Sequence, residues 1–332
     1  MRRSAVIVVL VTLGAAAPAC AFQAPSPPPT PAPSPPTAWA ARTAQDVTLD
    51  GVDTEPAWAT ATLHGDFRQF EPEPDAEPSH PTEFRVLYDA DDLYVFVRAF
   101  DAEPGQIMRA LTRRDDLGPA DRIGVLIDSY LDRRSGFAFF VNPDGVKRDY
   151  AVFNDSDQDG SWNGVWDVAT RVDSLGWTAE FRIPLSQLRY AEAERHRFGF
   201  GVRRGIQRYP ETTSWPAYSR TTAGLMSQLG TLEGLEGLGS ANRIEAIPYV
   251  VTKNVTRATA GGGYEHPQQV SAGADLKVGL TPNITLDATV NPDFGQVEAD
   301  PAQVNLSAFE TFFGERRPFF AEGTGLYRFQ LN

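Results

Sequence analysis

The strongest constraint on the fold is a series of short runs between residues 45 and 238, in which apolar side chains alternate or cluster as in β-strands. The runs are rich in β-branched and aromatic residues, and groups of Asp, Asn, Gly and Pro separate them. Asn-Pro-Asp-Gly at 142–145 is a strong turn signal. The long helical stretches that βαβ units need do not occur. We therefore predict an all-β domain, built as a β-sandwich. The predicted strands are residues 84–88, 93–100, 123–128, 137–141, 146–153, 168–172, 177–183 and 198–202.

The first 44 residues have the composition of an export signal followed by a spacer. Residues 1–21 are a predicted signal peptide, because a basic start precedes a small, apolar stretch and Ala19-Cys20-Ala21 fits a cleavage site. An alternative makes Cys20 a lipidation site. Residues 22–44 are a predicted Pro-rich linker, since proline removes the backbone donor and fixes φ.

Charge and motif content argue against several classes of protein. Lys and Arg number 30 against 43 Asp and Glu, a net charge of −13, whereas nucleic-acid binding depends on cationic side chains. A single cysteine excludes disulfides within the chain and thiolate zinc sites. No zinc-protease, serine-hydrolase, P-loop or Rossmann motif occurs. We therefore predict a protein without catalytic residues, with hydrolysis of O-glycosyl compounds as the alternative.

One acidic turn has the residue types of a calcium site. Asp155, Asp157 and Asp159 alternate before Gly160, and a tight loop of carboxylates suits a hard cation that takes six to eight oxygen ligands. An EF-hand is excluded, because its closing Glu would fall at Trp166 and no flanking helices are expected. We predict Ca²⁺ as a cofactor here, with a solvated acidic turn as the alternative.

Five segments of the region from 45 to 238 carry a family resemblance. They are residues 49–58 (LDGVDTEPAW), 92–97 with Asp101, 121–128 (DRIGVLID), 177–184 (WTAEFRIP) and 229–230. In this order they resemble family 9 carbohydrate-binding modules. The resemblance implies a jelly-roll-like β-sandwich, often with structural calcium, and attachment to xylan-degrading enzymes.

Only some of the family's sugar-binding residues have an equivalent in this chain. Members clamp a sugar between two Trp rings, one of which falls at Trp215, so the resemblance implies Trp215 as a ligand-binding residue. The second ring would fall near Gly118 and a family Glu near Gly124, and this chain departs from the pattern at both. We expect Trp58 and Trp177 to be core residues, and Trp215 to be either packed or a platform for a sugar.

The chain changes character after residue 238. The glycine-rich stretch 230–239 is a predicted linker. A strand is expected at 244–255, and residues 270–280 and 284–290 alternate apolar and polar side chains around a turn. Two such strands fit an outer-membrane β-barrel, with a soluble amphipathic hairpin as the alternative. We predict residues 239–332 to be the N-terminal part of a transmembrane-type antiparallel barrel.

Two further motifs are similar to an uncharacterised family of outer-membrane proteins, in which a family 9-like domain precedes a long barrel. They are residues 291–301 (NPDFGQVEADP) and 309–323 (FETFFGERRPFFAEG), within a match over about 243–329. Family members continue for several hundred residues beyond this point. We therefore expect the chain to be a fragment, or to assemble with another chain, because lipid tolerates no open sheet edge.

These features predict an exported protein of the cell outer membrane whose sandwich binds glycan without catalysis. The predicted partners are glycan and outer-membrane lipid, and not nucleic acid. One alternative is a transport or structural barrel protein whose sandwich is a plug or assembly module. Another is a component of carbohydrate catabolism associated with O-glycosyl hydrolases.

Overall fold

The computed structural model describes residues 35–238, 244–254, 256–258, 261–266, 268–281 and 284–291. The predicted signal peptide, most of the predicted linker and the motifs beyond residue 291 lie outside these residues. The described part of the chain is all-β, as predicted, with short 3₁₀ helices. None of its helices has the length and apolar character that a membrane crossing needs. The 3₁₀ helices are η1 (Trp58–Thr60), η2 (Pro104–Gln106), η3 (Leu185–Gln187) and η4 (Met226–Gln228).

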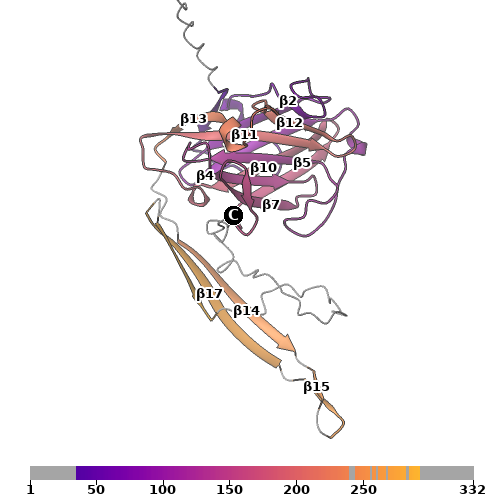
Figure 1. Ribbon diagram of the computed structural model, residues 1–332, viewed down its shortest axis with the longest axis vertical. Coiled ribbons are helices and arrows are strands. Elements are labelled where there is room, and N and C mark those ends of the chain that lie inside the picture. The colour runs from indigo at the N-terminus through magenta and orange to yellow at the C-terminus, as the bar shows by residue number, and fades with distance from the viewer. Residues whose placement is uncertain are drawn as a thin grey trace, which may run out of the picture. The chain divides into compact units, whose positions relative to one another are not determined.

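Thirteen strands form one sheet that curls into two facing layers (Figure 1). Layer A contains β2 (Arg68–Glu71), β5 (Arg122–Asp128), β6 (Gly136–Val141), β7 (Lys147–Phe153), β8 (Asp157–Asp159), β11 (Arg195–Ile206), β12 (Glu211–Trp215) and β13 (Gly230–Glu236). Layer B contains β3 (Thr82–Tyr88), β4 (Asp92–Phe100), β9 (Asp167–Asp173) and β10 (Gly176–Pro184). The strand order, β8-β7-β6-β5-β11-β13-β1-β3-β4-β10-β9, runs through both layers and includes β1 (Thr37–Arg42). The two remaining strands lie off this path, with β12 paired to β11 and β2 paired to β12. The eight strands predicted from the sequence in this region are confirmed.

The strand β1 (Thr37–Arg42) joins the two layers. Its first half, 37–39, pairs in parallel with β13 of layer A, and its second half, 40–42, pairs in parallel with β3 of layer B. Ala38 and Ala40 are buried in the core, whereas Trp39 between them is half exposed. The sandwich therefore begins inside the range 22–44, which the sequence assigns to a linker, and that prediction is wrong for Thr37–Arg42.

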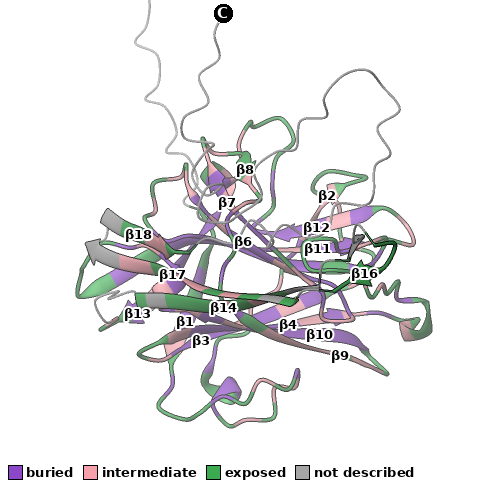
Figure 2. Ribbon diagram, turned by 90° about the horizontal axis from the view of Figure 1, so that it is seen from below, coloured by how far each residue is buried: buried purple, intermediate pink, exposed green. Residues whose placement is uncertain are grey.

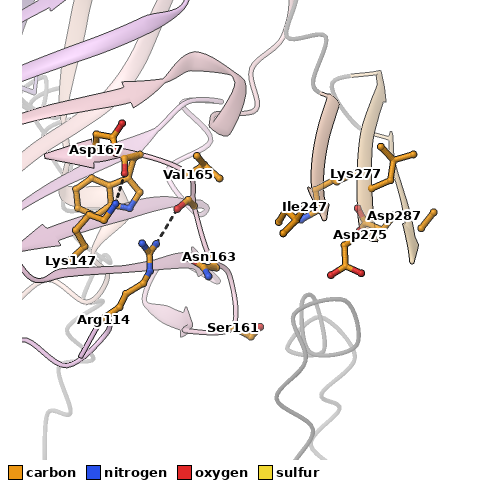
Figure 3. A pocket seen from close by; sticks show the side chains of 14 residues that line it. Arg114, Lys147, Ser161, Asn163, Val165, Asp167, Ile247, Asp275, Lys277 and Asp287 are labelled. Carbon is orange, nitrogen blue, oxygen red and sulfur yellow. Dashed lines mark hydrogen bonds between the residues drawn. The ribbon is translucent and has the colours of Figure 1, made fainter. Parts of the chain in front are cut away.

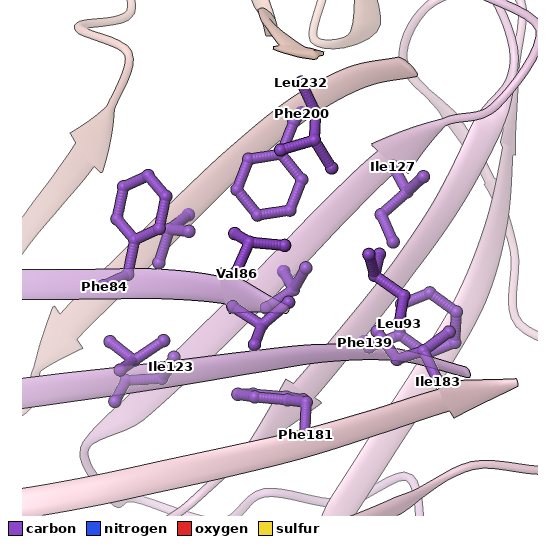
Figure 4. Packing of buried hydrophobic residues seen from close by; sticks show 14 of the residues in the cluster. Phe84, Val86, Leu93, Ile123, Ile127, Phe139, Phe181, Ile183, Phe200 and Leu232 are labelled. Atoms are coloured by element: carbon purple, nitrogen blue, oxygen red, sulfur yellow. The ribbon is translucent and has the colours of Figure 1, made fainter. Parts of the chain in front are cut away.

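The main core lies between the layers, because alternate residues of each strand point inward. Phe84 of layer B meets Phe200 of layer A with ring centroids 5.7 Å apart. Trp177 is fully buried in this core, as predicted. Figure 4 shows how inward side chains of both layers interdigitate, among them Val86, Leu93, Ile123, Ile127, Phe139, Phe181, Ile183 and Leu232.

The prediction of a linker at 230–239 is wrong, because Gly230–Glu236 is the strand β13. Its glycines allow the backbone of β1 and the residue before it to come close to β13. A Cβ on Gly230 would lie 2.7 Å from the carbonyl oxygen of Pro36, and one on Gly234 would lie 2.4 Å from that of Ala40. Gly234 also has a φ of 90°, which L side chains rarely adopt. Leu232 and Leu235 are fully buried on either side of it.

A smaller cluster covers the outer face of layer B, where the segment before β2 packs on the sheet. The Glu180 carboxylate of β10 accepts hydrogen bonds from the backbone N–H groups of Asp50 (3.0 Å) and Gly51 (2.9 Å) and from the indole of Trp58 (3.3 Å). We call these four residues the Glu180 latch. Trp58 is 1% exposed, which confirms it as a packing residue, although it lies in this outer cluster and not between the layers.

A second sheet of three strands follows, in the order β14-β17-β18. It contains β14 (Ile244–Asn254), β17 (Gln268–Thr281) and β18 (Ile284–Val290), which confirms the strands predicted there. The short strands β15 (Arg257–Ala258) and β16 (Tyr264–Glu265) pair with each other.

One face of this three-stranded sheet is apolar and open to solvent. Register places Ile244 opposite Val278, and Val278 opposite Leu286, so the apolar residues of all three strands share one face. Val250 is 70% exposed and Val290 is 68% exposed. Figure 2 shows the contrast between β14, exposed along much of its length, and the buried strands of the sandwich. Among the described residues, none covers this apolar face, and exposed apolar patches are typical of interaction surfaces.

Candidate functional site

The outer face of layer A carries a hollow whose floor is formed by glycines and one aromatic ring. Cross-strand register places Phe140 of β6 beside Gly124 of β5, and Gly124 beside Arg203 of β11. A Cβ on Gly124 would lie 2.2 Å from Phe140 Cε1, so the Phe140 ring lies directly over the glycine. The aliphatic part of Arg122 crosses Gly205 in the same way, with its Cγ 3.1 Å from where a Cβ would be.

Aromatic and cationic side chains form the walls of this space, which we call the layer A hollow. Its volume is about 400 Å³. Phe140 stacks on Tyr150 at 5.9 Å with an interplanar angle of 15°. The guanidinium of Arg148 lies 5.5 Å from the centre of the Tyr150 ring. Arg203 lies between two rings, 5.3 Å from Phe70 and 5.4 Å from Tyr218.

The Tyr150 hydroxyl stays protonated across the neutral range. Burial raises its pKa above the ordinary value of 10, and the charges of Arg203, Arg148 and Arg122 oppose that shift. A neutral phenol both donates and accepts hydrogen bonds. The hollow therefore combines flat apolar rings with hydrogen-bonding groups, which is the composition of small-ligand sites.

Both positions where the family 9 pattern is broken lie at this hollow. Gly118 lines it, and Gly124 lies beneath the Phe140 ring, which lines the hollow in its place. The backbone at Gly118 has a φ of 61°, and a Cβ there would lie 2.9 Å from Ala110 Cβ. A Trp at 118 would therefore need a different loop, and the Phe140 ring occupies the space above Gly124. Phe140 is a candidate that sequence reasoning missed, because its neighbours come from strands far apart in the chain.

Trp215 lies away from the hollow, in the core between the layers. It is 6% exposed and packs edge-on against Phe84 with centroids 5.1 Å apart. It pairs with Val202 of β11, which also points inward. The structure gives Trp215 a packing role, and its part in ligand binding stays a prediction.

The three aspartates predicted to bind calcium point to separate partners. Asp155 Oδ1 accepts hydrogen bonds from the N–H groups of Leu225 (3.0 Å) and Ser227 (2.8 Å), so it caps η4. Asp157 accepts from Asn154 at 3.2 Å. Asp159 accepts from its neighbour Ser161 at 3.0 Å. Among the described residues, no group of three or more His, Cys, Asp or Glu is placed to hold a metal. Calcium binding at this turn stays a prediction.

A buried ionic cluster at one end of the sandwich is a second candidate for chemistry. Arg208 binds Asp101 through two hydrogen bonds of 2.7 and 2.8 Å. Burial acts to raise the pKa of Asp101, but hydrogen bonds from Arg208 and from the Glu103 N–H hold it below its usual value. Nearby, Arg204 is 1% exposed and donates to the carbonyl oxygens of Phe100 (2.7 Å) and Pro81 (3.0 Å). Both oxygens of Asp101 are thus bonded within the protein and its side chain has no access to solvent, so this pair ties the end of β4 to the segment after β11.

The cations at the edge of β7 are also satisfied internally. Lys147 Nζ donates to the carbonyl oxygen of Trp166 at 2.6 Å, and Arg114 donates to that of Gly164 at 3.0 Å, as the dashed lines of Figure 3 show. Arg114 also pairs with Asp149 at 2.5 Å. Burial lowers the pKa of Lys147, and the charge of Arg114 lowers it further. These groups hold the loop after β8 in place, which leaves the layer A hollow as the candidate site.

Comparison with known proteins gives one family and several distant folds. The family described as "Domain of unknown function (DUF5916)" matches residues 240–330. No curated protein sequence matches the chain. A family 9 carbohydrate-binding module from Caldicellulosiruptor kristjanssonii, solved with cellotriose, is similar at 16% identity and a TM-score of 0.43, over 60% of this chain and 93% of that one.

Two further solved structures are similar over the same share of the chain. The Caldicellulosiruptor kristjanssonii module solved with glucose has 15% identity and a TM-score of 0.44, and 95% of it is covered. A suggested carbohydrate-binding protein from Bacteroides uniformis has 12% identity and a TM-score of 0.47, and 99% of it is covered. At such low identities and scores, the bound sugars describe those proteins alone.

Proposed function

We propose that the sandwich binds glycan, without catalysis, in the layer A hollow. One observation carries this proposal: the rings of Phe140 and Tyr150 and the guanidinium groups of Arg148 and Arg203 border the same space of about 400 Å³. A sugar presents apolar C–H faces and a rim of hydroxyls. Aromatic rings pack on the former, and charged donors bond to the latter.

The family 9 resemblance supports the same position. One of its motifs, residues 121–128, runs through β5 and contributes Arg122 to the hollow. Of the two places where the family's sugar-binding side chains would fall, 118 lines the hollow and 124 lies beneath the Phe140 ring that lines it. In this chain Phe140 supplies the ring from a neighbouring strand. We propose that the clamp is replaced by a single aromatic floor with cationic walls.

Calorimetric titration of the full chain, kept in mild detergent, tests the proposal with xylan- and glucan-type oligosaccharides. We expect binding that weakens about tenfold or more in Phe140→Ala, because a buried aromatic contact is worth roughly 1–2 kcal/mol. Trp39→Ala is the matched control, since Trp39 is an exposed aromatic on β1. The proposal would be overturned if the chain bound no glycan while its circular dichroism showed that it was folded. It would also be overturned if Phe140→Ala and Trp39→Ala lost the same affinity.

A second candidate is a plug or assembly module for a barrel. The burial of Trp215, the family's ligand-stacking position, favours this role, because a fold can be kept after its ligand site has changed. The absence of glycan binding in the titration above would make this the leading proposal.

We propose further that the protein is exported and that residues 239–332 belong to the outer membrane. The uncovered apolar face of β14, β17 and β18 supports this, with Asp275, Lys277 and Asp287 on the opposite face. One apolar and one polar face per strand is the pattern of a membrane barrel wall.

Flotation with lipid vesicles tests this placement. Val250 lies on the apolar face and Val251 on the polar face, so the two positions form a matched pair. Arg on the lipid side costs about 2–4 kcal/mol at mid-membrane, and we expect Val250→Arg to reduce the floated fraction while Val251→Arg does not. Equal behaviour of both variants would contradict the proposal.

A further inference from the structure

Three arginines point into the layer A hollow without a carboxylate partner. They are Arg122 of β5, Arg148 of β7 and Arg203 of β11. Within the described part of the chain, none of the three forms an ion pair or a hydrogen bond through its side chain. Several arginines elsewhere in the sandwich are paired, among them Arg85 with Asp53 at 2.6 Å, Arg98 with Asp173 at 2.6 Å and Arg208 with Asp101 at 2.7 Å. Some exposed arginines of the described residues, such as Arg171, are not. The hollow differs in that it brings three such guanidinium groups to one space.

Aromatic faces hold two of these groups while leaving their donors unused. Arg148 lies over Tyr150, and Arg203 lies over Phe70 and Tyr218. A cation–π contact orients the guanidinium plane but consumes no N–H group. Arg122 is fixed differently, by the passage of its stem across Gly205. Each of the three guanidinium groups is therefore held in position, and its N–H donors remain available to a ligand.

Carboxylates also border the hollow, but they do not neutralise these arginines. Asp116 accepts the N–H of Gly118 at 2.9 Å. Asp115 lies 3.9 Å from Arg114 Nε. Glu71, at the end of β2, is exposed to solvent. The chain has a net charge of −13. Even so, among the residues that the structure describes, no carboxylate forms an ion pair with Arg122, Arg148 or Arg203.

We propose that the layer A hollow selects acidic saccharides, meaning sugars that carry carboxylate or sulfate groups. This proposal rests on the glycan binding proposed above and adds the charge of the ligand. Guanidinium forks match the two oxygens of a carboxylate or sulfate and bond to them more strongly than to a hydroxyl. Phe140 supplies the flat face for the ring of the same sugar residue.

Titration of the full chain in mild detergent with three matched trisaccharides tests the proposal: neutral cellotriose, trigalacturonate and a sulfated trisaccharide. Because hydrogen bonds between two charged groups are stronger than those to a neutral hydroxyl, we expect at least one acidic ligand to bind at least about tenfold more tightly than cellotriose. Comparison of the affinities for trigalacturonate and the sulfated trisaccharide shows whether the hollow prefers carboxylate or sulfate. The affinity of the acidic ligand should also fall as salt rises.

Substitution of individual arginines tests whether the preference for acidic ligands depends on the layer A hollow. We expect Arg203→Gln and Arg148→Gln each to weaken acidic ligands about tenfold. Cellotriose should lose less affinity than the acidic ligands in both variants, because Gln can still bond to a hydroxyl but cannot pair with an anion. Arg148 is exposed, so its substitution tests the proposal even if the half-buried Arg203→Gln variant fails to fold. Arg171→Gln, an exposed arginine on β9 of the other layer, is the control and should leave affinity unchanged.

The outcomes separate this inference from the proposed function. Cellotriose binding as tight as that of the acidic ligands overturns the acidic preference and leaves glycan binding intact. Binding of no saccharide by a folded chain overturns both. If Arg171→Gln lost as much affinity for the acidic ligands as Arg148→Gln, the preference would depend on the overall charge of the protein. That result would overturn the assignment of the preference to the hollow.

Discussion

The Glu180 latch makes the stability of the sandwich depend on pH in a direction opposite to that of most acidic groups. Burial raises the pKa of Glu180 from 4.5 to about 7, with the N–H groups of Gly51 and Asp50 opposing that shift and the nearby acids Glu55 and Asp50 adding to it. A raised pKa means that the folded state favours the neutral carboxyl group. Its contribution to stability is therefore complete below pH 4.5 and is lost as pH rises through 7.

The size of the effect follows from the pKa difference. The interval from 4.5 to about 7 spans roughly 2.5 pH units, and each is worth about 1.4 kcal/mol, which gives a loss of about 3 kcal/mol between pH 4 and pH 8.5. Glu180→Gln keeps the shape of the side chain and cannot ionise. We therefore expect its free energy of unfolding, relative to the wild type, to rise by about 3 kcal/mol across that pH range.

Urea unfolding followed by tryptophan fluorescence measures this difference directly. All 6 tryptophans lie within residues 35–238, so the signal reports on the sandwich alone. Glu194→Gln, on an exposed loop, is the control and should give a constant difference from the wild type. The reasoning is refuted if the Glu180→Gln difference does not change with pH, or if it changes in the opposite direction.

Three further substitutions test packing and capping by the same unfolding assay. Trp215→Ala should lower the free energy of unfolding by about 3–5 kcal/mol, as for a large core aromatic; a loss below about 1 kcal/mol would contradict its burial. Asp155→Ala removes the cap of η4 and should cost about 1–2 kcal/mol, against less than about 0.5 for the exposed Asp157→Ala. Equal costs would show that the cap is not formed. Asp101→Asn leaves the Arg208 charge without its partner and should cost about 3 kcal/mol at neutral pH. A variant as stable as the wild type would show that this ion pair contributes nothing.

The strands could be predicted because their signal is local. In residues 177–183, apolar side chains that face the main core alternate with polar or charged ones on the outer face of layer B, so the period of two is visible in the sequence. The turn at 142–145 is specified by its own residues. The strand β13 could not be predicted in this way. Its glycines have the composition of a linker, and only the closeness of the Pro36 and Ala40 carbonyl groups gives the reason for them.

The candidate site was harder to predict than the fold, because it depends on register across several strands. Phe140 and Arg203 are 63 positions apart in the sequence, and they become neighbours only through Gly124 between them. The family resemblance indicated positions 118 and 124, but it could not indicate which ring replaces the missing side chains. Trp215 illustrates a related limit. A family motif identified this residue, but the motif did not show which face of the sheet its side chain lies on.

The double pairing of β1 has a mechanical consequence. Since the first and last strands of the sandwich, β1 and β13, are parallel neighbours, the chain enters at one end of this pair and leaves at the other. Tension between the two flanking segments would pull these strands past each other, loading their hydrogen bonds together in shear rather than one after another. Because β1 also pairs with β3, the same tension would be shared by both layers. Such an arrangement suits a module that must stay folded while its two ends are pulled apart.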